Sequence, residues 1–180
     1  MQNICVFLSS NTPEDKYRLP AIRFAEILGK KGHRLVWGGA NMGLMGDVAH
    51  VARKHGAYLS GVIIERLKDY AFVEIDVLFI TPDISKRKEV MLDMSGAFVV
   101  LPGGIGTLDE FIHVVEMKKG GSHNKPIVVL NTEGFFDPIL RMFENISREG
   151  FYKRDMDDLV KFVSEPEEIF EYLESYKVLQ

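Results

Sequence analysis

The chain has 180 residues, 46% of them hydrophobic and 27% charged, and its formal net charge of −4 comes from both signs spread along the sequence. This composition is typical of a globular protein with a substantial core, so we expect residues 1–180 to form a single domain. The sequence has no basic block of the kind that predicts nucleic-acid binding, and no segment has the pattern of a signal peptide or a membrane span. Cys5 is the only cysteine, which excludes an internal disulfide and favours a cytoplasmic location.

Strand-like and helix-like segments alternate along the chain. Apolar runs predict strands at 3–8, 33–37, 57–64, 76–80, 96–101, 126–130 and 159–163. The segments between them predict helices at 15–29, 44–55, 84–95, 107–119, 135–149 and 166–176. Because the strands are apolar on both faces, this alternation predicts an α/β fold with an open parallel sheet covered by helices on both sides. Ligands of such sheets bind beyond the carboxyl ends of the strands, where the strand order reverses.

Two glycine-rich loops each connect a predicted strand to a predicted helix. The first is GGANMGLMG at 38–46, and the second is PGGIGT at 102–107. Neither matches the GxGxxG dinucleotide fingerprint, and the chain has no GxxxxGK[ST] phosphate loop. Glycine before a helix start favours an anion that approaches the backbone, although strand ends and helix caps alone would explain one such loop. Two in a chain of this length make the anion-binding interpretation stronger.

The second loop continues into Thr107 and Glu110, whose spacing has two interpretations. Propensity alone favours a capping box, in which the Thr107 hydroxyl caps a helix and Glu110 reaches back to the Thr107 N–H. The same arrangement would also place a carboxylate beside the anion loop. Arg87 and Lys88 begin a predicted helix whose following strand leads into this loop, and their pattern fits a solvated helix face or a cationic site.

Several segments together are similar to one known family. They are GGANMGLMGDVA (38–49), SGVI (60–63), the Arg87-Lys88 pair followed by Met91, PGGIGTLDE (102–110) and HNKPIVVLNTEGFFDPIL (123–140). The chain resembles the Lonely Guy family, the cytokinin-activating phosphoribohydrolases long labelled possible lysine decarboxylases, whose PGGxGTxxE motif it matches at every fixed position. The resemblance implies a Rossmann-like doubly wound fold, usually a homodimer, that hydrolyses the N-glycosidic bond of a nucleoside 5′-monophosphate without a cofactor or metal.

The resemblance also implies roles for individual residues. Arg87 and Glu110 would be the catalytic pair, acting on AMP or a cytokinin riboside 5′-monophosphate to release free base and ribose 5-phosphate. The 5′-phosphate would be held by Gly103, Gly104, Gly106 and Thr107. We expect further substrate contacts from Ser10, Gly38, Gly39, Gly43 and Lys88.

The chain departs from the family pattern at several positions. Leu8-Ser9-Ser10-Asn11 stands where Cys-Gly-Ser-Ser is common, and Ile84-Ser85-Lys86-Arg87-Lys88 stands where Met-His-x-Arg-Lys is common. His113, Glu116 and Met117 replace the usual Glu, Thr and Trp of the following helix. These departures leave the preferred base, and cytokinin specificity above all, open.

Two other functions compete with hydrolysis. A non-catalytic carrier of a nucleotide or of molybdenum cofactor would need the glycine loop but not the Arg87 and Glu110 pair, so the presence of both favours the hydrolase. A pyridoxal-phosphate decarboxylase would need a Schiff-base lysine. The candidate Lys125 precedes Pro126 at a predicted strand start, which indicates a structural role.

Overall fold

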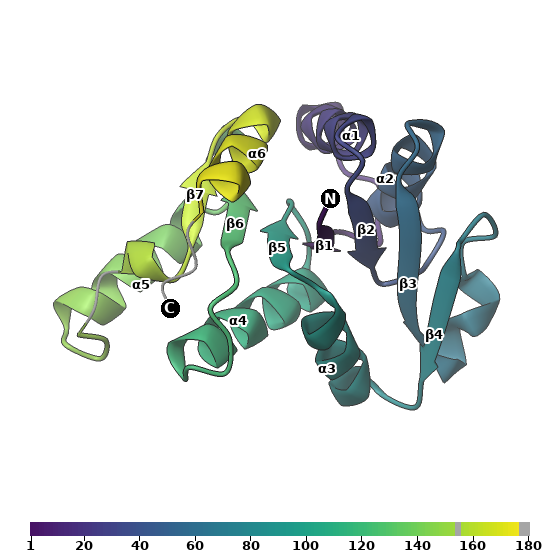
Figure 1. Ribbon diagram of the computed structural model, residues 1–180. Coiled ribbons are helices and arrows are strands. Elements are labelled where there is room, and N and C mark those ends of the chain that lie inside the picture. The colour runs from purple at the N-terminus through teal and green to yellow at the C-terminus, as the bar shows by residue number, and fades with distance from the viewer. Residues whose placement is uncertain (154–155, 177–180) are drawn as a thin grey trace.

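The computed structural model describes residues 1–153 and 156–176, and it contains one seven-stranded sheet (Figure 1). Its strands are β1 (Asn3–Phe7), β2 (Arg34–Trp37), β3 (Tyr58–Ile64), β4 (Val77–Thr81), β5 (Ala97–Val100), β6 (Ile127–Leu130) and β7 (Lys161–Val163). Its helices are α1 (Asp15–Lys30), α2 (Gly43–Lys54), α3 (Ile84–Met94), α4 (Ile105–Lys119), α5 (Asp137–Arg148) and α6 (Pro166–Ser175). Each predicted strand and helix is confirmed, with its ends within two residues of the prediction. Three short 3-10 helices were not predicted: η1 (Glu65–Tyr70), η2 (Thr132–Gly134) and η3 (Met156–Asp158).

The sheet separates two hydrophobic cores. In β1, Ile4 and Val6 face a core that includes residues of α1, α2 and α6, whereas Cys5 and Phe7 face one that includes residues of α3, α4 and α5. The same division of helices into two layers is visible in Figure 1. Because successive residues of a strand point to opposite faces, a strand between two helical layers must be apolar throughout. This requirement explains the continuous apolar runs of the sequence.

The strand order, β4-β3-β2-β1-β5-β6-β7, reverses direction at the centre of the sheet, and every strand pairing in it is parallel. From β1 the chain proceeds outward through β2, β3 and β4. It then returns through α3 to β5, which pairs with the other side of β1, and proceeds outward through β6 and β7. The loops after β1 and β5 therefore diverge and leave a crevice between them. The predicted doubly wound parallel sheet is confirmed.

The return through α3 determines which side chains meet at this crevice. Since α3 connects the edge strand β4 to the central strand β5, it crosses beneath β3, β2 and β1, on the face of the sheet that α4 also covers. Its first turns, with Arg87 and Lys88, consequently lie beside the first turns of α4.

Within the described residues, no helix is long and apolar enough to cross a membrane.

Candidate active site

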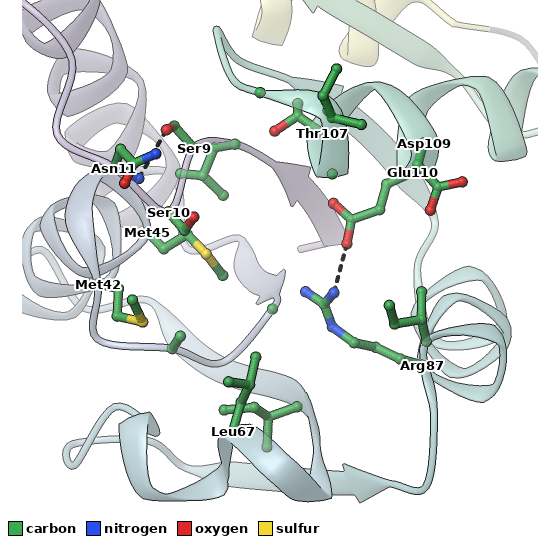
Figure 2. Close-up of a pocket in the computed structure, with 18 of the residues that line it drawn as sticks. Ser9, Ser10, Asn11, Met42, Met45, Leu67, Arg87, Thr107, Asp109 and Glu110 are labelled. Carbon is green, nitrogen blue, oxygen red and sulfur yellow. Dashed lines mark hydrogen bonds and ion pairs between the residues drawn. The ribbon is translucent and has the colours of Figure 1, made fainter.

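A cavity of about 400 Å³ lies where the strand order reverses (Figure 2). This volume is within the range of small-molecule sites, roughly 300–1,000 Å³. The walls come from the segment after β1, the loop before α2, the end of β3 with η1, the start of α3 and the start of α4. Seven of the predicted site residues line it: Ser10, Gly38, Arg87, Gly104, Gly106, Thr107 and Glu110. Residues 77 positions apart in the sequence, such as Ser10 and Arg87, thus share one cavity.

Helix α4 begins at the cavity, but not in the way the capping box predicts. Gly104 is the N-cap residue, no side chain caps the helix, and Thr107 is already the third helical residue. The capping-box interpretation is therefore wrong, and the helix begins two residues before the predicted Thr107. Glu110 lies in the second turn, where its side chain is directed to another helix. The first N–H groups of α4 and the positive end of its dipole are left for an anion.

The glycines of this loop fall into two physical classes. A Cβ atom at Gly103 would collide with the side chain of Thr107, so the fold itself requires glycine there. A Cβ atom at Gly104 or Gly106 would meet no other atom within 4 Å, and neither residue has a positive φ. Both line the cavity. Packing does not explain glycine at 104 and 106, whereas a ligand in contact with the backbone would.

Arg87 and Glu110 form an ion pair on the cavity wall, with Arg87 Nη1 at 3.0 Å from Glu110 Oε1 (Figure 2). Arg87 Nε also donates a 2.8 Å hydrogen bond to the carbonyl oxygen of Val62 in β3, which fixes the guanidinium between the sheet and α4. The two side chains are only 19% and 10% exposed. An ion pair of this kind has little competition from water, so its geometry is well defined.

The environment of Glu110 opposes its ionisation. Burial raises the pKa of this carboxyl group above its usual value of 4.5, while the nearby Arg87 lowers it, and the net direction is upward. A carboxyl group in a cleft whose ionisation is opposed by burial is characteristic of catalytic sites, although structural ion pairs can also have a shifted pKa.

The first glycine loop makes room for the chain's own groups. A Cβ atom at Gly38 would collide with Arg87 Nη2 and with Met45 Cε, so glycine at this position lets the guanidinium enter the cavity. Gly43 has φ +49° and its α-carbon faces the backbone of Ser10, which it holds at the cavity edge. Gly39 packs against β3. Of the three, only Gly38 lines the cavity.

Lys88 lies outside the cavity lining, as do Gly39, Gly43 and Gly103. Lys88 Nζ instead contacts both carboxylate oxygens of Asp109, at 2.9 and 3.0 Å. Asp109 does line the cavity, next to Glu110, and sequence reasoning did not select it. Its position in the motif, directly before the matched glutamate, was the available signal.

An apolar group of cavity residues was also missed. It comprises Ile63, Ile64, Leu67 and Ile105. Ile105 is 83% exposed although it is a large apolar residue in the first turn of α4. Figure 2 shows Leu67 and Met42 on the side of the cavity away from Thr107. The uncapped start of α4, with the exposed Ile105, therefore lies on one side of the cavity, and the apolar side chains of Leu67 and Met42 lie on the other.

The fold and the site define a Rossmann-like α/β protein with its cavity at the switch point of a parallel sheet. Residues 45–173 match the model of the family described as possible lysine decarboxylase, and the chain belongs to this family. Lys125, which a Schiff-base mechanism would need, lies away from the cavity lining, and its Nζ donates to the carbonyl oxygen of Leu92 at 2.7 Å.

Named relatives agree with this assignment. The chain is 32% identical over 176 residues, 96% of its own length and 79% of the relative's, to a probable cytokinin riboside 5′-monophosphate phosphoribohydrolase of Oryza sativa subsp. japonica. It is 40% identical over 126 residues, 69% of its own length and 67% of the relative's, to a cytokinin riboside 5′-monophosphate phosphoribohydrolase of Mycobacterium marinum. The molybdenum cofactor binding protein of Rippkaea orientalis has the same fold, with a TM-score of 0.73, 21% identity and coverage of 96% and 94% of the two chains.

Proposed function

We propose that this protein hydrolyses the N-glycosidic bond of a nucleoside 5′-monophosphate of the AMP or cytokinin riboside type. Water adds to C1′ of the ribose, the bond from C1′ to the base nitrogen breaks, and the products are the free base and ribose 5-phosphate. The observation that carries the proposal is that one cavity is lined both by the ion pair of Arg87 and Glu110, which is largely shielded from solvent, and by the uncapped start of α4 with its open glycines. The names of the plant and bacterial relatives support it.

The chemistry assigns a task to each group. Breaking the glycosidic bond develops positive charge on the sugar, so the Glu110 carboxylate stabilises an oxocarbenium-like transition state or orients the attacking water. Arg87 retains donors beyond those that hold Val62 and Glu110, and with them it binds ribose or phosphate oxygens. The first turn of α4, with Gly104, Gly106 and Thr107, accepts the 5′-phosphate, and Ser10 faces the same space. The apolar end formed by Met42 and Leu67 receives the base.

The decisive experiment is incubation of the purified protein with a panel of nucleoside 5′-monophosphates, with free base and ribose 5-phosphate measured by chromatography. We expect hydrolysis of at least one nucleotide and much slower hydrolysis of the corresponding nucleoside, because the phosphate site is then empty. Adenosine cleaved as fast as AMP would refute the phosphate assignment. Tight nucleotide or molybdenum-cofactor binding with no turnover of any panel member would favour the carrier.

We further propose that the protein is a homodimer in the cytoplasm. The dimer is supported by exposed apolar side chains on the edge strand β4, where Phe79 is 40% and Ile80 is 50% exposed. Large apolar groups together on an edge strand are typical of a surface that a partner covers. The cytoplasmic location is supported by the free, buried thiol of Cys5.

A further inference from the structure

Two ion pairs lie side by side where α3 meets the start of α4. Arg87 pairs with Glu110 at 3.0 Å, and the next residue of α3, Lys88, pairs with the preceding residue of α4, Asp109, at 2.9 Å. The Lys88 side chain is only 17% exposed, whereas that of Asp109 is 51% exposed. The protein therefore covers most of the Lys88 side chain, although its partner is exposed. Its charge lies close to the proposed catalytic pair, yet the side chain does not line the cavity.

Asp109 is a second carboxylate beside Glu110, and it lines the same cavity. After burial, which raises the pKa of Glu110, the charged neighbours act in opposite directions: Arg87 lowers this pKa, Asp109 raises it and Lys88 lowers it. Two other titratable groups are near this cluster. Burial, and after it the charge of Glu110, raises the pKa of the Cys5 thiol, and burial lowers the pKa of His113. The balance around Glu110 is therefore set by Arg87, Lys88 and Asp109.

We propose that Lys88 is a positioning residue for the hydrolysis proposed above, which holds and neutralises Asp109 so that Glu110 keeps its negative charge opposite Arg87. Without the lysine, Asp109 is an unpaired carboxylate directly beside Glu110, and its charge opposes the charge of Glu110. Arg87, which is fixed between the Val62 carbonyl and Glu110, is then the remaining cation that balances two acids. This role replaces the direct substrate contact that the sequence predicted for Lys88. It places the function of the lysine in the charge balance of α3 and α4.

The test uses Lys88→Met, Asp109→Asn and the double variant, with Lys86→Met as the matched control. Lys86 lies on the same helix and pairs with Glu89 at 2.8 Å, away from the cavity lining. We expect Lys88→Met to lower kcat at acidic pH by on the order of tenfold, as is usual for groups coupled in one salt-bridge network, with KM within about twofold. Removing Asp109 as well should restore most of this loss, because no second negative charge then remains beside Glu110. Lys86→Met should behave as the parent does.

A second readout does not depend on turnover. The side-chain carboxyl carbon of Glu110, assigned by its loss in Glu110→Gln, is followed by NMR as the pH changes. Its titration should move to higher pH in Lys88→Met and return toward the parent in the double variant. An unchanged titration in Lys88→Met overturns the inference, even if the parent proves to have no hydrolase activity and the proposed function fails. A raised KM without rescue would show a substrate contact, and equal losses in all three variants would show a mechanical clamp. Either result refutes the inference.

Discussion

Glu110→Gln tests the role of the carboxylate most directly. Glutamine has the same shape and keeps an oxygen that can accept from Arg87 Nη1, now 3.0 Å from Glu110 Oε1. The substitution loses roughly 1 kcal/mol, because a hydrogen bond to a charged acceptor is stronger than one to a neutral acceptor. Part of this loss is offset, because a neutral glutamine costs less to bury than a carboxylate. We therefore expect the free energy of unfolding to change by at most about 1 kcal/mol. Turnover, in contrast, should fall by a factor on the order of 10² or more, because an anion at the developing oxocarbenium ion is lost.

The assay measures release of adenine and ribose 5-phosphate from AMP, with nucleotide affinity measured by calorimetry and stability by urea denaturation. Binding should persist in Glu110→Gln. Arg87→Lys should reduce turnover similarly, since it keeps the charge but loses both the fork and the hydrogen bond from Nε to Val62. Glu116→Gln is the matched control, because Glu116 belongs to the same helix and pairs at 2.7 Å with Lys119 away from the cavity lining. A folded Glu110→Gln protein that hydrolyses AMP at the parent rate would refute the catalytic assignment.

Three further predictions concern the phosphate loop, pH and assembly. Gly106→Ala adds a methyl group into open space within a helix, so the free energy of unfolding should stay the same or increase by up to roughly 1 kcal/mol. The KM for AMP should increase, because the methyl group would occupy space proposed for the phosphate. An unchanged KM would contradict the phosphate role. Burial raises the pKa of Glu110 above 4.5, so activity that needs the carboxylate should be lost as the pH falls through the raised pKa. Stability should show the opposite trend. The protonated group binds its proton more tightly in the folded state, and this contribution is lost as the pH rises through the raised pKa. A profile with no acidic limb above 4.5 would exclude this assignment. Sedimentation at micromolar concentration should show a dimer, and a monomer would refute it.

The order and type of the elements could be predicted because each one has a strong local signal. The strands are buried on both faces and so are apolar at every position, while glycines or polar residues mark most of their ends. The short helix η1 was missed because its sequence, ERLKDY, has no apolar period and none of its residues is buried. Its Leu67 became a cavity residue only through the position of the loop after β3. The fold therefore follows from local patterns more completely than the site does.

The start of α4 shows why part of the site was mispredicted. Thr107 and Glu110 have the spacing of a capping box, and local propensity has no means to show that a group from another helix competes for the acid. That competitor, Arg87, lies 23 residues earlier in the sequence and reaches Glu110 only because α3 crosses beneath the centre of the sheet. The long-range ion pair makes Glu110 a cavity residue, and Gly104 at the N-cap leaves the helix start open.

The two glycine loops look alike in the sequence, yet they leave space for different things. At Gly38 the space is already occupied by the chain itself, because the Arg87 guanidinium and the Met45 methyl group fill it. At Gly104 and Gly106 no atom of the described chain fills it. A sequence pattern cannot separate these cases, since both need the absence of a side chain. Under the proposed function, the space at the first loop admits the catalytic arginine and the open space at the second admits the phosphate, so both lie where β1 and β5 diverge.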